Sequence, residues 1–190
     1  MTTVAIPEWN TLGLLPPTDP ADPTSAERSP YPVALLDVVL RFATSPERCK
    51  VLEGFLDYRA ALHGMGLVSG FQWLDGSFTE QVETLERRPP KDIDVVTFVH
   101  TPDDFDPSDE QIGVLDHDAA KARFLVDSYF VEINQEPPEV LVERSAYWYS
   151  MWSHRRNQAW KGYLQIDLNP EHDADAREHL TLLDGQEAQA

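Results

Sequence analysis

The spacing of apolar and polar positions predicts helices early in the chain, after an irregular start. Residues 31–43 have apolar spacing suited to a helix. A second helix begins at Ser45-Pro46, because serine is a favoured N-cap and proline a favoured first helical residue. It runs to about Leu62, where Gly64 and Gly66 end it.

Strand-like stretches follow, interrupted by further helical segments. Apolar, β-branched or aromatic runs predict strands over residues 70–74, 93–98, 124–133 and 161–168. A short helix is predicted near residues 118–123, and a longer one over 139–157, opened by Pro137-Pro138. Together these elements predict an α+β fold in which helices flank a mixed sheet.

The proline distribution separates the start of the chain from its body. Seven of the fifteen prolines fall within the first 32 residues, so residues 1–30 are predicted to be an extended arm held on the body by Trp9 and the leucines of 12–15. Residues 31–169 then form one domain, since 190 residues suit a single core. Residues 170–190 are predicted to be an acidic polar tail.

The charge of the chain is uneven. Its net charge of −18 argues against a protein that grips a nucleic-acid backbone. Residues 101–118 carry seven acids and no lysine or arginine, and residues 170–190 carry six acids and one arginine. Such segments are predicted to be solvated loops or tails; the alternative is that they recruit a basic protein partner.

Apolar length and cysteine content narrow the protein class. No apolar stretch approaches transmembrane length, and the start lacks the features of a secretory signal, so a cytoplasmic protein with no membrane partner is expected. Cys49 is the single cysteine, which excludes an internal disulfide and a cysteine metal site.

The candidate chemistry lies between residues 71 and 98. Asp92 and Asp94 stand two apart in an apolar strand, so both carboxylates leave the same face. Two like charges there are costly unless a cation neutralises them or they reach solvent, and Mg²⁺ or Mn²⁺ is the expected partner. Upstream, Gly76 permits a tight turn, and Ser77 with the following N–H groups can hold an anion such as phosphate.

A strand, the Gly76-Ser77 turn, an excursion and then the Asp92-Ile93-Asp94 strand resemble the DNA polymerase beta-like nucleotidyltransferase superfamily. The chain is most similar to small uncharacterised bacterial members, through residues 6–10 and 14–17 among others. The resemblance implies a nucleotidyltransferase-like fold, a Gly-Ser turn that binds an NTP triphosphate, and paired aspartates that hold two magnesium ions. The interval between Ser77 and Asp92 is longer than in many members.

A third acid is expected on a later strand, because metal-assisted phosphoryl transfer needs a further ligand and a general base. Asp127, in the middle of an apolar run, is the chosen residue, and the resemblance implies the same role. Asp167 is a second contender, whereas Glu132 lies near a strand end. The alternative is a structural Asp127 bonded to backbone or to Arg123.

Structural alternatives also exist for the other candidate residues. Asp92 can cap the strand start, and Asp94 can pair with Lys91 or Arg88. The aromatic residues of the 139–157 helix are expected in the core rather than as a platform for stacking bases. Lys161 is the first candidate for a phosphate contact, near the cations Arg155 and Arg156.

These features predict transfer of a nucleoside monophosphate from an NTP to an unknown acceptor hydroxyl, with release of pyrophosphate. Asp92, Asp94 and Asp127 are the predicted catalytic and metal-binding residues, and Gly76, Ser77 and Lys161 the predicted nucleotide-binding residues. The acceptor is a protein, a tRNA end or a small molecule, and the resemblance implies a toxin–antitoxin or phage-defence setting. The alternative is a catalytically silent protein of the same fold that acts as an acidic binding partner or antitoxin.

Overall fold

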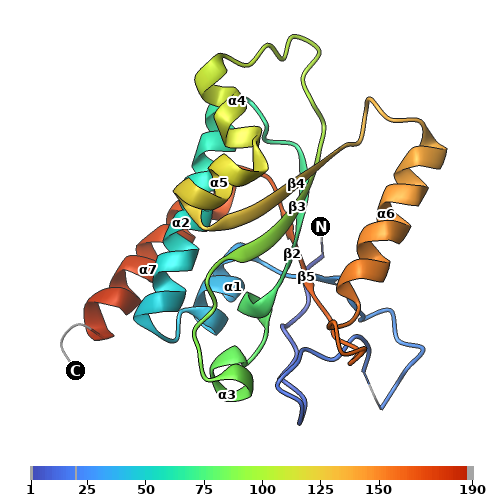
Figure 1. The fold of residues 1–190 in the computed structure, drawn as a ribbon, viewed down its shortest axis with the longest axis vertical. Helices are drawn as coiled ribbons and strands as arrows, with labels where there is room; N and C mark the ends of the chain where they lie inside the picture. The colour runs from blue at the N-terminus through green and yellow to red at the C-terminus, as the bar shows by residue number, and fades with distance from the viewer. Residues whose placement is uncertain (1, 20, 188–190) are drawn as a thin grey trace.

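The computed structural model describes residues 2–19 and 21–187, and a five-stranded mixed sheet runs through its middle (Figure 1). The strand order is β1-β5-β2-β3-β4. The strands are β1 Tyr31–Pro32, β2 Gly70–Asp75, β3 Ile93–Val99, β4 Val126–Glu132 and β5 Leu164–Asp167. Strand β2 runs antiparallel to both β3 and β5, whereas β3 and β4 are parallel. The predicted α+β class with a mixed sheet is confirmed.

Helices lie on both faces of this sheet. They are α1 Leu35–Phe42, α2 Pro46–Gly64, α3 Val82–Glu86, α4 Asp109–Leu115, α5 His117–Phe124, α6 Pro138–Trp152 and α7 Asp173–Glu187, with short 3₁₀ turns η1 Ser77–Thr79 and η2 Pro170–His172. Figure 1 shows α1, α2, α4, α5 and α7 on one face and α6 on the other. The sheet is therefore covered on both faces, as its apolar strands require.

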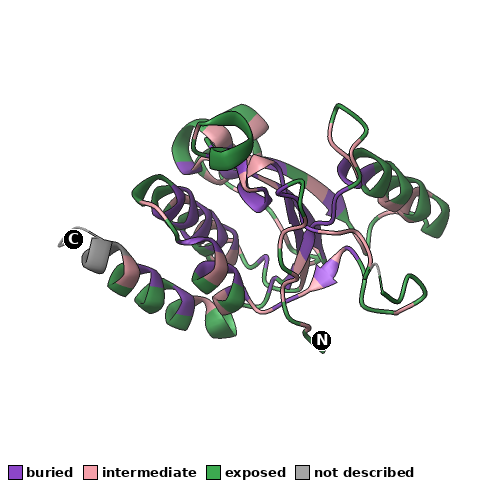
Figure 2. Cartoon of the chain, turned by 90° about the horizontal axis from the view of Figure 1, so that it is seen from below, coloured by how far each residue is buried: buried purple, intermediate pink, exposed green. Residues whose placement is uncertain are grey.

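The main core lies between the sheet and α2. This helix begins as predicted, with Pro46 at its first position and the Ser45 side chain accepting a hydrogen bond from the Arg48 amide. Its apolar side, which includes Leu52, Phe55 and Leu56, is fully buried against the strands. Figure 2 shows this buried layer between the helices and the sheet.

A second, aromatic core lies under α6. Trp148 and Trp152 of this helix are buried against Trp73 of β2 and Phe98 of β3. The expectation that the aromatic residues of α6 pack in the core is confirmed for these two tryptophans. Tyr147 on the same helix is 54% exposed.

The first thirty residues pack on the body without a helix or strand in their described part. Leu14 and Leu15 are buried, and the Trp9 indole donates a hydrogen bond to the Thr79 carbonyl at 2.9 Å. This segment therefore contacts the turn that follows β2.

The prediction of a solvated tail over residues 170–190 is wrong for its described part. Residues 173–187 form α7, which packs on α1 and α2 and buries Ala176 and Leu180. The apolar residues recur at helical spacing, and this periodicity outweighs the acidic composition. Within this segment the structure describes residues 170–187.

The acidic segment 101–118 is also more regular than predicted. It contains α4 and the start of α5 instead of a loop alone. Ser108 caps α4 with a full capping box to Gln111, and the Asp116 carboxylate caps α5. Several acids therefore lie in first turns, where the helix dipole favours them. None of the described helices is long and apolar enough to cross a membrane.

Candidate functional site

Three aspartates lie side by side on neighbouring strands, facing α6. The sheet register pairs Asp75 of β2 with Asp94 of β3, and Asp94 with Asp127 of β4. We call these three residues the acid row. Residues paired in register point to the same face, so the register brings three carboxylates together at one level of the sheet.

Asp92 joins the acid row through a lysine. It lies one residue before β3, and Lys121 of α5 places its Nζ 2.9 Å from Asp92 Oδ2 and 2.7 Å from Asp127 Oδ2. The predicted residues Asp92, Asp94 and Asp127 are thus brought together. The alternative partners for Asp94 do not form: Arg88 pairs with Glu86 at 2.8 Å, and no ion pair joins Asp94 to Lys91 among the described residues.

Asp75 at the other end of the row has its own lysine. Lys161 Nζ lies 2.9 Å from Asp75 Oδ1 and 3.1 Å from Glu80 Oε1, and the Lys161 side chain is 7% exposed. Burial raises the pKa of Asp75 to about 6 despite this cation. Burial lowers the pKa of Lys161, but the two carboxylates outweigh burial and hold it above its usual value. The lysine predicted to contact phosphate is therefore a fixed charge in the wall of the site.

Asp94, in the middle, lies within electrostatic range of Lys161 but is not joined to it by an ion pair. Among the described residues its carboxylate forms no ion pair and accepts no hydrogen bond. Burial raises its pKa to about 7, and the neighbouring carboxylates Asp75, Asp127 and Asp92 add to the shift. The pKa of Asp94 therefore lies near neutral pH, with other acids on both sides. A structural ion pair does not explain this feature of the site.

The turn after β2 is shaped around Asp94. Gly76 has a φ of 85°, and a Cβ at this position would lie 2.3 Å from Asp94 Oδ2. Ser77 begins η1, and its hydroxyl forms no hydrogen bond with the described residues. The Gly-Ser turn therefore opens directly onto the central carboxylate.

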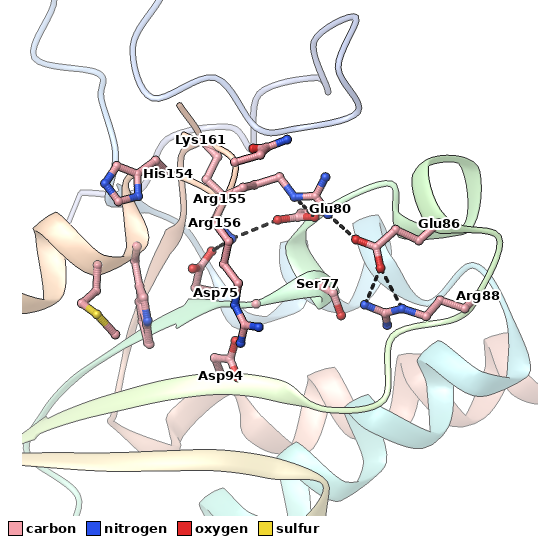
Figure 3. A pocket seen from close by; sticks show the side chains of 14 residues that line it. Asp75, Ser77, Glu80, Glu86, Arg88, Asp94, His154, Arg155, Arg156 and Lys161 are labelled. Atoms are coloured by element: carbon pink, nitrogen blue, oxygen red, sulfur yellow. Dashed lines mark hydrogen bonds and ion pairs between the residues drawn. The ribbon is translucent and has the colours of Figure 1, made fainter. Parts of the chain in front are cut away.

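A cavity of about 550 Å³ lies over this turn, and the segment that follows α6 forms its far wall (Figure 3). It is lined by four acids and four cations: Asp75, Glu80, Glu86, Asp94, Arg88, Arg155, Arg156 and Lys161. Arg155 pairs with Glu80 at 3.2 Å and also with Glu86. Arg156 is exposed and has no ion pair with a described residue. Figure 3 shows Arg156 reaching into the cavity toward Asp94.

The donor set suits a hard divalent cation. Its members are carboxylates, the ligands that Mg²⁺ and Mn²⁺ prefer. Asp127 Oδ1 is buried without a hydrogen bond in the described chain, although His117 Nδ1 lies 3.1 Å away, and Asp94 forms no ion pair with a described residue. Three His, Cys, Asp or Glu side chains already placed to hold a metal do not occur in the described part of the chain. The residues therefore fit a cation chemically, with Lys121 occupying the space between two of them.

The other candidates lie apart from this cluster. Asp167 faces Phe71 in the register, at the opposite end of β2 from Asp75, and its Oδ1 accepts the Asn169 amide at 2.9 Å. Glu132 is exposed at the end of β4. Asp75 is the acid that the sequence reading missed. Its position could have indicated the site, because Asp75 immediately precedes Gly76 and lies on the same face of the strand as Trp73.

Comparison with protein-family models relates most of the chain to a family. A model described as "Family of unknown function (DUF6932)" matches residues 7–167, which is most of the chain. The chain therefore belongs to this family. Neither the curated proteins nor the solved structures give a significant match.

Proposed function

We propose that this DUF6932 protein transfers a nucleoside monophosphate from an NTP to an acceptor hydroxyl and releases pyrophosphate. The observation that carries the proposal is the Asp94 carboxylate, which forms no ion pair with a described residue, stands within a row of acids and lies directly under the Gly76-Ser77 turn. The order β2-β3-β4, with the turn after β2 and the acids on β3 and β4, also agrees with the nucleotidyltransferase-like fold that the sequence resembles.

Each part of the site has a role in this reaction. Asp92, Asp94 and Asp127 would hold Mg²⁺ or Mn²⁺, which when bound offsets the negative charge of the phosphates. The backbone after Gly76 and the Ser77 hydroxyl orient the triphosphate. Arg156, which pairs with no acid in the part of the chain that the structure describes, is a further counter-charge in the cavity.

The chemistry needs one proton acceptor. The acceptor oxygen forms a bond to the α-phosphorus, and the bond from that phosphorus to the bridging oxygen of pyrophosphate breaks. The hydroxyl proton passes to a carboxylate, for which Asp127 is the proposed residue. Its Oδ1 is buried and accepts no hydrogen bond in the described chain, and His117 Nδ1 lies 3.1 Å away.

The acceptor is a protein, a tRNA end or a small molecule. The net charge of −18 favours a protein or small molecule, since an acidic surface repels a nucleic-acid backbone. We place the activity in a bacterial defence or toxin–antitoxin setting on the resemblance described above.

A second candidate function is a catalytically silent protein of the same fold that binds a basic partner. One observation favours it: Lys121 and Lys161 already neutralise Asp92, Asp127 and Asp75. In this case Asp75, Asp92 and Asp127 stabilise the sheet through their ion pairs. The acidic segments that contain α4, the start of α5 and α7 supply the attraction for the partner.

The test is incubation of the purified protein with each labelled NTP, Mg²⁺ or Mn²⁺, and cell lysate, followed by identification of the labelled species. The double variant Asp92→Asn, Asp94→Asn should abolish labelling. The matched control is Asp104→Asn with Asp106→Asn, which removes the same charge from the distant acidic segment and should leave labelling unchanged. No NTP binding and no label from the unmodified protein, together with salt-sensitive capture of a basic protein, would establish the second function instead.

A further inference from the structure

We infer that Lys121 is an internal competitor for the cation, a lysine that occupies the space between Asp92 and Asp127 and must leave when a divalent ion binds. The inference rests on the proposed function, because it concerns the same site. It assigns Lys121 as the residue that sets the affinity of the site for the ion, without contact with the reacting atoms.

The contacts of Lys121 define this role. Its Nζ lies 2.7 Å from Asp127 Oδ2 and 2.9 Å from Asp92 Oδ2, so one ammonium group bridges both carboxylates. A divalent ion that uses these oxygens as ligands needs the same space. The lysine and the ion therefore exclude each other between these two residues.

Lys121 is free to move away. Its side chain is 43% exposed, and no described residue other than the two aspartates holds its ammonium group. Asp92 and Asp127 are only 24% and 16% exposed, but solvent at the lysine end and flexibility of the lysine stem reduce the net energy of the pair. Loss of the contact costs little when a doubly charged ion replaces a single charge.

The second lysine of the site shows what a fixed charge looks like. Lys161 is 7% exposed and is held by Asp75 and Glu80, whose side chains are 3% and 5% exposed. Removing it would leave buried carboxylates without a cation, so it cannot give way to a ligand at low cost. The two lysines therefore have different roles. Lys161 is a fixed part of the site, whereas Lys121 occupies the ion position reversibly.

The test is Mn²⁺ binding without nucleotide, measured by titration calorimetry or by the spin-resonance signal of free Mn²⁺. Lys121→Met removes the charge but keeps the aliphatic stem, and should tighten binding ~2–5-fold, the range that corresponds to removal of a weak competing ion pair. Lys121→Arg keeps the charge and should bind like the unmodified protein. The matched control is Arg123→Met, an exposed cation on the same helix that lies over the Phe124 ring and pairs with no described acid, and it should change affinity less than about twofold.

The outcomes separate the inference from the proposed function. Equal or weaker Mn²⁺ binding by Lys121→Met, with clear binding by the unmodified protein, overturns the inference and leaves the metal site standing. No binding by any variant overturns both. Lys121→Met should also melt at a lower temperature than the unmodified protein without Mn²⁺ and gain more from added Mn²⁺, which shows that the variant is folded and that the ion has replaced the lysine.

Discussion

Two polar clusters lie on opposite faces of β2 and β3, and they differ in how their charges are paired. On the α2 face, Arg59 is fully buried and holds Asp173 of α7 and Gln72 of β2. On the α6 face, the acid row gathers around Asp94, whose carboxylate has no partner among the described residues. Both clusters place charge inside the fold, so burial of charge alone does not identify a functional site.

Whether each charged group has a partner distinguishes a structural cluster from a functional one. The Arg59 guanidinium donates hydrogen bonds to both carboxylate oxygens of Asp173, at 2.7 and 2.8 Å. The Gln72 side-chain amide donates a hydrogen bond to the Thr97 hydroxyl at 3.0 Å. Every group in that chain has a partner, which is how a buried polar network stabilises a fold. Asp94 instead raises the energy of the folded state, and such a cost is tolerated where function needs it.

The largest effect is expected from removal of α7, which would take Asp173 out of the Arg59 cluster. A chain that ends at Asn169 loses the buried Leu180 and the partner of Arg59, so its free energy of unfolding should fall by at least ~4 kcal/mol. Urea denaturation measures this. A chain that ends at Glu187 keeps α7 and should match the full protein. Equal stability of the shorter chain would restore the solvated-tail interpretation.

A single substitution should disrupt the same cluster almost as strongly. Arg59→Met leaves Asp173 and Gln72 without their partner, and a loss of ~3–5 kcal/mol is expected for a broken buried pair. Arg177→Met, which removes an exposed pair with Asp57 between the same helices α7 and α2, should cost less than ~1 kcal/mol. Similar losses for both variants in thermal and urea unfolding would mean that burial of the Arg59 pair contributes nothing.

The sequence predicts the acid row better than it predicts the Arg59 cluster. Asp92, Asp94 and Asp127 were found because local strand patterns carry them, and parallel pairing of β3 with β4 brings them together. Asp75 was missed because it lies at the very end of its apolar run, and the strand register that pairs it with Asp94 is not visible in the local sequence around either residue.

The Arg59 cluster could not be predicted for a related reason. Arg59 and Asp173 are 114 residues apart, and nothing local to either residue indicates the pair. The acidic composition of the last residues suggested solvent exposure, whereas the two apolar positions Ala176 and Leu180 decide that α7 packs on the body. Long-range packing, rather than local propensity, set this part of the fold.

In the acid row, substitution of Asp94 is expected to stabilise the folded protein, whereas substitution of Arg59 is expected to destabilise it. Asp94→Asn removes the charge that burial disfavours, so the free energy of unfolding without metal should rise at pH 8. The folded pKa of about 7 lies above the ordinary value of 3.8, so the folded state holds its proton longer than the unfolded chain. Stability from this group is present below pH 4 and is lost as the pH rises to about 7. The full shift corresponds to at most ~4 kcal/mol.

Urea unfolding at several pH values tests this. Asp94→Asn should flatten the stability profile between pH 4 and 7 and should also weaken Mn²⁺ binding. The control Asp104→Asn, in the acidic segment before α4, should do neither. A loss of stability in Asp94→Asn at pH 8 would place Asp94 in the same class as the Arg59 cluster, as a structural carboxylate.

The smallest effect on stability is expected at Ser77. Its hydroxyl has no hydrogen-bond partner among the described residues and faces the cavity, so Ser77→Ala should change the free energy of unfolding by less than ~0.5 kcal/mol. The same substitution should weaken binding of a non-hydrolysable NTP about tenfold, as expected when a hydrogen bond to a charged phosphate is lost. Mn²⁺ affinity without nucleotide should stay unchanged, because the hydroxyl is not among the proposed ligands. Ser69→Ala, an exposed serine before β2, is the matched control for calorimetry. Equal NTP affinity in Ser77→Ala and the unmodified protein would mean that the Gly-Ser turn serves only to make room for Asp94.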